Sequence, residues 1–257
     1  TTTLIYDEAR RLIKLKKSET EYTSIIYDTE GNVSQIEEYL GGEKTNYTTY
    51  LHLANEVEAI FYEYQDSKWL GKYKNIIELN ENNEIIRETE YTKDAGADVW
   101  IEDGDYYTYQ WENGNLLKAE NWDNYSSPST KKNTGLYLPG LFKSAKKVYL
   151  SRNKSKNKTG DYKVFSTTLF EYDNKINSFR FLTIGNYLLA PDVFNISKNN
   201  WSKLTYNDIN QRNITCIFTF GYNDKNYPII LEKNYTDISV SGTINILQTE
   251  YYKYNCK

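Results

Sequence analysis

Few residues in this 257-residue chain have the types and spacing that chemistry at a protein site requires. The richest group is Glu102, Asp103 and Asp105, which surround Gly104 in the segment IEDGDYY. Closely spaced carboxylate oxygens are ligands that Ca²⁺ accepts. The rest of a calcium-binding loop is missing, however, and Asp-Gly is a common hairpin turn. We therefore expect a turn at this segment and no bound metal.

Motifs for catalysis are also scarce. His52 is the single histidine and has no cysteine pair near it in the sequence, so a zinc site is not expected. No nucleophile elbow, phosphate-binding loop or His/Cys cluster occurs. Glu37 and Glu38 are adjacent carboxylates, but neighbours on a strand point to opposite faces and cannot act together. The sequence therefore predicts a protein that is not an enzyme and needs no cofactor.

Aromatic residues are the better candidates for a binding site, because the chain contains 26 Tyr, 9 Phe and 5 Trp. If several of them line one concave face, they could hold a lipid tail or stack on a sugar. The alternative is that the rings form cross-strand pairs that stabilise a sheet. The candidate ligand-binding residues are Tyr62, Tyr64, Trp69, Trp100, Tyr107, Tyr109 and Trp111.

A repeated hairpin must position these residues. In IIYDTEGNVSQIEEY, residues 25–39, an apolar run stops at a Tyr-Asp pair and a second alternating run begins at Val33. Asp28 can accept a backbone hydrogen bond within its own turn, and Gly31 can take a positive φ. These features predict a β-hairpin.

Further copies of this hairpin unit occur along the chain. In one of them Asn226 takes the place of Gly31, and Asn also tolerates a positive φ. The spacing between copies is irregular, so we expect a meander and not a solenoid of fixed period. The sequence predicts an all-β, mainly antiparallel fold in which hairpins form a curved open sheet or half-barrel. The copies are residues 6–15, 79–88, 110–119, 172–179 and 222–231.

Short helices and one soft boundary are also predicted. Residues 138–150 are the best helix candidate, with Pro139 in the first turn. Residues 188–200 are expected to form a loop with one helical turn. The polar stretch at residues 124–136 could separate two halves. Because hairpin copies lie on both sides of it, we predict a single β-rich domain over residues 1–257. One or two short helices would accompany the sheet.

The composition limits the possible partners and compartments. The net charge is −4 with both signs mixed along the chain, so no nucleic-acid surface is expected. No run approaches the roughly 18 apolar residues of a membrane helix. The chain contains no Met, so we expect that an N-terminal segment has been removed. Cys216 and Cys256 form either a disulfide in an oxidising compartment or two buried thiols.

Residues 136–256 resemble a known family. The segments LYLPGLF, FEYDNKINSF, NYLLAPDVFNISKNN, FTFGYNDKNYPIILEKNY and EYYKYNC follow one another there. This order is similar to cell-envelope lipoproteins of Bacteroidetes with a domain of unknown function, some of them described as lipid-binding. The family usually has Gly where this chain has Asn226. The hairpins also resemble, by analogy only, the longer Tyr-Asp repeats of secreted shell proteins.

The resemblance implies an antiparallel β fold in the envelope of a Gram-negative bacterium, in the periplasm or at the outer-membrane surface. The resemblance implies no catalytic residues. Membrane contact is expected only through a removed N-terminal lipid anchor. We expect a monomeric, non-enzymatic binding protein for a lipid or other amphipathic molecule, held in the concave face. The alternatives are a surface glycan-binding or adhesion module that uses exposed Tyr and Trp, and a purely structural scaffold.

Overall fold

The chain forms a long antiparallel meander. The computed structural model describes residues 3–9, 11–93, 99–124, 162–177, 197–226 and 228–251. Within these ranges there is one 15-stranded sheet and no helix, and each strand pairs with the next one in sequence. The predicted all-β fold is therefore confirmed. The strands are β1 (Thr3–Tyr6), β2 (Leu12–Lys16), β3 (Tyr22–Tyr27), β4 (Val33–Leu40), β5 (Glu43–His52), β6 (Glu56–Gln65), β7 (Lys68–Leu79), β8 (Ile85–Lys93), β9 (Trp100–Glu112), β10 (Asn115–Asn124), β11 (Tyr162–Ile176), β12 (Asn199–Asp208), β13 (Asn213–Tyr222), β14 (Pro228–Ser239) and β15 (Gly242–Tyr251).

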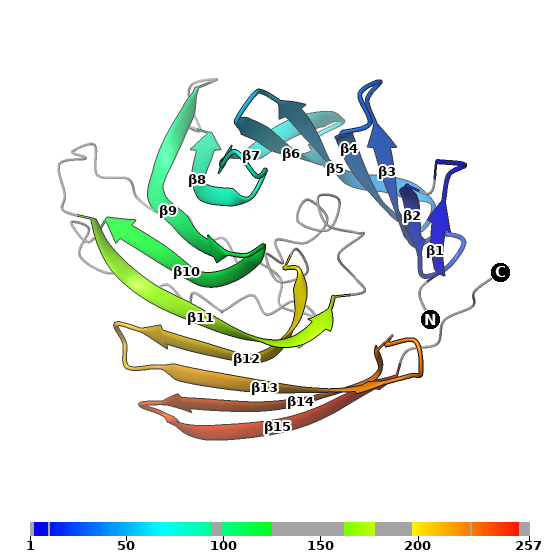
Figure 1. The fold of residues 1–257 in the computed structure, drawn as a ribbon. Coiled ribbons are helices and arrows are strands. Elements are labelled where there is room, and N and C mark those ends of the chain that lie inside the picture. The colour runs from blue at the N-terminus through cyan, green and yellow to red at the C-terminus, as the bar shows by residue number, and fades with distance from the viewer. Residues whose placement is uncertain are drawn as a thin grey trace.

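The sheet is strongly curved and stays open. Figure 1 shows the ribbon bending from β1 on the right, over the top through β6, around the left side at β9 and back along the bottom to β15. Among the strands that the structure describes, β1 and β15 each have one neighbour, so they are the two edges of this sheet. The prediction of a curved open sheet is confirmed.

The predicted Tyr-Asp turns share one hydrogen-bond pattern. Asp28 Oδ1 accepts the backbone N–H groups of Glu30 and Asn32 at 2.9 and 2.8 Å, and the N–H of Asp28 donates to the carbonyl of Asn32 at 2.8 Å. Gly31 has φ +89°, the left-handed conformation that this turn requires. A short acceptor side chain at the first turn position therefore fixes the loop. Asx acceptors with backbone hydrogen bonds also occur at Asp7, Asn80, Asp208 and Asn223.

The turns of the confirmed hairpin copies gather at one end of the sheet. The hairpin copies turn after β1, β3, β7, β9 and β13. Every second turn of an antiparallel meander returns to the same end, which explains why the copies are separated by other strands. The copy at residues 110–119 is a hairpin with a tight Asn113-Gly114 turn, in which both residues have positive φ.

Two turns differ from the sequence-based prediction. The turn expected within residues 172–179 is wrong for residues 172–176. These residues belong to β11, which continues to Ile176 and shows a shift of register to β12 in place of a turn. A turn was also missed at Asp208, between β12 and β13. The residues that flank it are Asn207 and Asn213, so the apolar signal of the other copies is absent.

Some predicted features lie outside the described residues. They are the helix at residues 138–150, most of the segment at residues 188–200, and all of the soft boundary beyond Asn124. Cys256 lies outside as well, whereas Cys216 is a buried free thiol whose pKa is raised to about 11 by burial. The strand prediction for the N-terminal copy is confirmed by β1 and β2.

One face of the sheet, called the packed face, carries the hydrophobic core. Side chains on the inner side of a bent sheet converge and those on the outer side spread apart, so we assign the packed face to the inside of the curve. The other face is called the open face. The buried residues of the core are Leu12, Ile25, Val33, Ile36, Tyr50, Val57, Ile77, Ile85, Tyr109, Leu116, Phe170, Leu204, Tyr206, Ile214, Cys216, Phe218, Leu231 and Tyr235.

Side-chain hydrogen bonds on the packed face tie neighbouring hairpins together. In each case a ring near the end of one strand contacts a backbone carbonyl at or next to the start of the preceding strand. The register shifts beside these carbonyls, so the regular ladder is interrupted there. These hydrogen bonds give the aromatic residue before each turn a structural role, and they give His52 the same role. The pairs are Tyr27 Oη to Leu12 at 2.9 Å, His52 Nε2 to Val33 at 2.8 Å, Trp111 Nε1 to Ile85 at 2.6 Å and Tyr172 Oη to Leu116 at 2.6 Å.

An ion pair at the β12–β13 turn predicts a pH dependence of stability. Arg212 Nη2 donates to Asp237 Oδ2 at 2.6 Å, and Arg212 Nε donates to Oδ1 at 3.1 Å and to Oδ2 at 3.2 Å. The Arg212 hydrogen bonds lower the pKa of the Asp237 carboxyl, and Tyr235 adds a further hydrogen bond. A depressed folded-state pKa stabilises the fold above the unfolded-state pKa, and this contribution is lost as the pH falls through the folded value.

We expect Asp237→Asn to lower the free energy of unfolding by about 1.5–3 kcal/mol at pH 7. The difference in unfolding free energy between wild type and variant should shrink as the pH falls from 5 to strongly acidic values. Wild-type Asp237 is then protonated and uncharged, like the Asn side chain. Urea unfolding at several pH values measures the loss of stability at pH 7 and its dependence on pH. Asp224→Asn, in an exposed turn, is the control and should change little. A difference that stays constant down to acidic pH would contradict the ion-pair account.

Candidate functional site

The seven predicted binding residues divide between the two faces of the sheet. Tyr107 pairs with Glu88, which in turn pairs with the core residue Ile77, so Tyr107 and its alternate neighbours lie on the packed face. Tyr62 pairs with Tyr47 and Gly71 on the open face. The structure thus brings four of the seven together and separates the other three from them. The open face holds Tyr62, Tyr64, Trp69 and Trp100, and the packed face holds Tyr107, Tyr109 and Trp111.

The three packed-face aromatics contact polar groups of the interior. Tyr109 Oη donates to Glu88 Oε2 at 3.1 Å, and Asn75 Nδ2 donates to Glu88 Oε1 at 2.6 Å. The pKa of Tyr107 is raised well above its ordinary value by burial and by the nearby carboxylates, Glu90 first among them. Trp111 makes one of the hydrogen bonds between hairpins. These contacts stabilise the sheet, with Tyr109 buried and Tyr107 and Trp111 half-buried against the core.

The open-face aromatics form a continuous group across three strands. The rings of Tyr47 and Tyr62 stack at 4.6 Å with planes 9° apart. Trp69 meets Tyr47 edge-on at 4.9 Å and lies 5.1 Å from Tyr64. Tyr47 was not among the predicted residues, although its alternation in the segment NYTTYLH was the signal that could have found it. Cross-strand ring pairs of this kind contribute about 0.2–1 kcal/mol each to the sheet.

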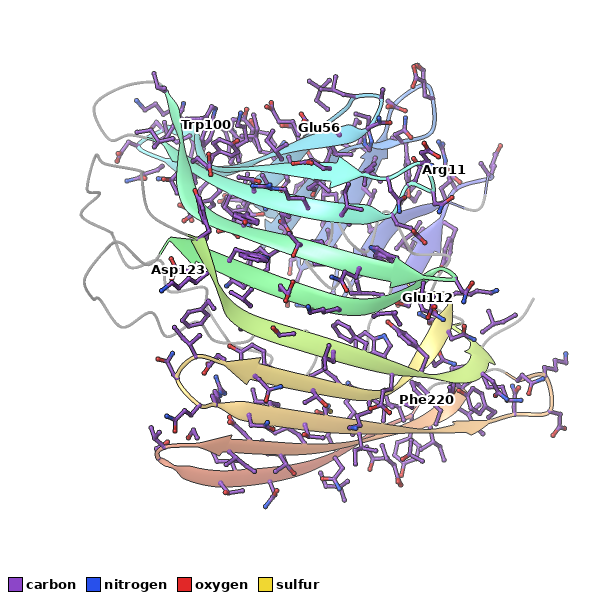
Figure 2. The ribbon with its side chains drawn as sticks, turned by 60° about the vertical axis from the view of Figure 1, so that its left-hand side comes forward. Arg11, Glu56, Trp100, Glu112, Asp123 and Phe220 are labelled. Carbon is purple, nitrogen blue, oxygen red and sulfur yellow. The ribbon has the colours of Figure 1, made fainter. Side chains whose placement is uncertain are left out.

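Trp100 joins this group through a glycine. A Cβ at Gly71 would lie 3.3 Å from both Cζ2 and Cη2 of Trp100 and 3.6 Å from Cγ2 of Ile60. Since Gly71 has no side chain, the indole of Trp100 from β9 can lie against β7. Figure 2 shows Trp100 at the upper end of β9, with Glu112 at the opposite end of the same strand. We call the five residues Tyr47, Tyr62, Tyr64, Trp69 and Trp100 the aromatic platform.

Charged side chains border the platform. Lys44 Nζ lies 5.3 Å from the Tyr47 ring centre and 5.7 Å from that of Trp69, and it pairs with Glu37 at 2.7 Å. Lys93 Nζ lies 5.4 Å from the Trp100 ring centre. The site therefore combines ring surfaces with donors and acceptors at its border. Such a surface suits a ligand that has both an apolar face and polar edges.

The remaining chemical candidates do not converge. The turn predicted at Gly104 is wrong: Gly104 has φ +85° inside β9, where the register to β8 shifts. Glu102 accepts a long hydrogen bond from Tyr162 on the open face, whereas Asp105 is buried. In the described part of the chain, no group of three or more His, Cys, Asp or Glu residues could hold a metal ion.

Glu37 and Glu38 point to different surroundings, as the strand geometry predicts. Glu37 is buried and accepts hydrogen bonds from Gln35, Tyr39 and Lys44, while Glu38 is exposed.

Across the ranges that the structure describes, no helix is long and apolar enough to cross a membrane.

Comparisons with known proteins give no family. No family model and no curated protein matches the chain. Among solved structures, a porin-like protein from Bacteroides uniformis is 11% identical with a TM-score of 0.36, and the match covers 98% of this chain and 93% of that one. A porin-like protein from Bacteroides vulgatus is 9% identical, with 98% and 92% covered and a TM-score of 0.31.

A third similar structure is a protein of unknown function from Bacteroides fragilis. It is 11% identical, with a TM-score of 0.30, and the match covers 48% of this chain and 79% of that one. These similarities place the chain in no family.

Proposed function

We propose that this protein is a non-enzymatic glycan-binding module that holds a sugar chain on the aromatic platform. The observation that carries the proposal is the position of Trp100 against Gly71, which extends the ring surface of Tyr47, Tyr62 and Trp69 from β5 to β9. A glycine that makes room for an indole on the open face creates a broad apolar surface. The hydrophobic core on the packed face does not need it.

The chemistry of a pyranose ring fits this surface. One side of the ring presents C–H groups that pack on aromatic faces, and its hydroxyl groups point outward around the edge. Lys44 lies beside the rings of Tyr47 and Trp69 and would supply a donor for such a hydroxyl. A chain of several sugars would span more than one ring of the platform.

A lipid inside the curve is the other function that the sequence suggested. The packed face carries Glu88, Asp105 and Lys233 among its buried residues. These charged groups are already buried, and an acyl chain laid beside them could not hydrogen-bond to them, whereas charged groups held away from water need such partners. This observation makes us rank the glycan above the lipid.

We retain a place in a bacterial cell envelope as part of the proposal, supported by the family resemblance of residues 136–256.

Trp100→Ala is expected to weaken glycan binding at least about tenfold, since loss of one stacked ring costs on the order of 1.4 kcal/mol or more. Ligands are first found on a glycan array, and affinities are then measured by isothermal titration calorimetry. Gly71→Val should have a similar effect, because its side chain would displace the indole.

Trp122→Ala is the matched control for this experiment. Trp122 is also on the open face but stacks on Tyr106 outside the platform, so its loss should leave binding unchanged. An array without any ligand, or equal losses for Trp100→Ala and Trp122→Ala, would contradict the platform as the binding site. Far-UV circular dichroism checks that each variant is folded.

A further inference from the structure

The two edges of the sheet are built differently. β1 has only four residues, its register to β2 shifts between Ile5 and Tyr6, and the acidic residues Asp7 and Glu8 follow it directly. Short, irregular and charged edges are the devices by which natural sheets avoid pairing with other chains. β1 is thus protected.

β15 has none of these devices. It runs for ten residues, Gly242–Tyr251, and pairs with β14 through ten consecutive residue pairs without a register shift. Its sequence GTINILQTEY contains no Lys, Arg or Pro and one charged residue, Glu250. β14 is its only strand neighbour in the described sheet, so its other side presents backbone N–H and C=O groups of alternate residues.

Apolar side chains on both faces of β15 are exposed. Leu247 is 71% exposed and Tyr251 is 78% exposed, and alternation places both on the open face. Ile244, on the packed face, is 58% exposed. Apolar side chains on both faces, next to polar ones, are more often found on a strand with neighbours on both sides. As an edge, it has the pattern of a surface that pairs with another strand.

We propose that β15 pairs antiparallel with β15 of a second copy of this chain, with Leu247 of each copy opposite Leu247 of the other. This register places Tyr251 opposite Thr243 of the second copy and Asn245 opposite Thr249. Glu250 stands opposite Ile244, so no two like charges meet. Aromatic and β-branched residues opposite each other stabilise antiparallel strands, and charge repulsion is absent.

The pairing closes after two copies. The contact uses the same strand in both chains, so a two-fold axis relates them and neither β15 has a further free side. Because β1 is protected, the second edge of each sheet does not continue the assembly. The platform lies on β5, β6 and β7 along the top of Figure 1 and on β9 at the left, whereas β15 lies at the bottom, so the dimer leaves both platforms accessible.

The mass in solution tests the proposal directly. Multi-angle light scattering on the full chain over a wide concentration range should give twice the 30.2 kDa of one chain at high concentration. Leu247→Lys puts two positive charges opposite each other and should raise the dimer dissociation constant at least about tenfold. Leu51→Lys is the control, because Leu51 is 56% exposed on β5, an interior strand.

A mixture of two variants identifies the occupant of the edge. Leu247→Lys and Leu247→Glu should each be monomeric alone, and an equimolar mixture should form dimers because Lys then stands opposite Glu. Circular dichroism confirms that both variants are folded. A wild-type chain that is monomeric at every concentration overturns the proposal and restores the monomer expected from the sequence. A dimer that Leu247→Lys leaves unchanged also overturns it, as does a mixture that stays monomeric.

Discussion

Leu204→Ala is expected to lower the free energy of unfolding by about 2–5 kcal/mol. Leu204 is completely buried at the centre of β12, where it pairs with Phe170 on one side and Cys216 on the other. Removing its side chain leaves a cavity between strands that cannot close, because both neighbouring strands are held by their own ladders. Equilibrium urea unfolding followed by circular dichroism measures the loss.

The neighbouring open face supplies the control for this prediction. Ile217 on β13 is half exposed and pairs with Lys203, the residue before Leu204. Ile217→Ala should change the stability by no more than about 0.5 kcal/mol. If the two substitutions cost the same, the assignment of the core to the packed face is wrong.

Tyr172→Phe is expected to lower the free energy of unfolding by about 1–3 kcal/mol, although it removes a single oxygen. The Tyr172 hydroxyl donates to the carbonyl of Leu116 and shares a hydrogen bond of 2.7 Å with Ser197 Oγ. Ser197 Oγ also accepts the N–H of Leu116 at 3.1 Å. The substitution leaves the Leu116 carbonyl without this donor in a buried place, where the regular ladder is interrupted.

The same measurement on an exposed tyrosine separates the effect of losing the buried hydrogen bond from the effect of losing a hydroxyl group. Tyr6 is half exposed near the β1 edge, and Tyr6→Phe should leave the unfolding midpoint unchanged. A Tyr172→Phe variant as stable as the wild type would show that hydrogen bonds between hairpins do not hold the meander together.

Local chemistry explains why the hairpins could be predicted. The turn at Asp28 needs only an acceptor at its first position and a residue with positive φ three places later, and both are readable in the sequence. The same reasoning failed at residues 172–177, where Asp173 accepts a hydrogen bond from Lys175 within β11. An Asx hydrogen bond therefore marks a turn or a strand irregularity, and pairing with β12 decided which.

The candidate site was only half predictable for a different reason. Alternation shows that Tyr62 and Tyr64 share a face and that Tyr107 and Tyr109 share a face. It cannot say whether these two faces are the same, because each shift of register between strands changes the relation. The shifts at Phe61/Tyr62 and Thr89/Tyr91 lie between the two pairs.

The sequence by itself determined the all-β meander, its Asx turns and the aromatic residues that mark its strand ends, because these features depend on neighbours within a few residues. Only the tertiary structure decided which rings meet, since the bulges set the faces and Gly71 admits Trp100 from a strand far along the chain. It also decided that β15 is an edge of the sheet formed by the described strands. That property depends on which strands have partners, and no local pattern in the residues of β15 expresses it.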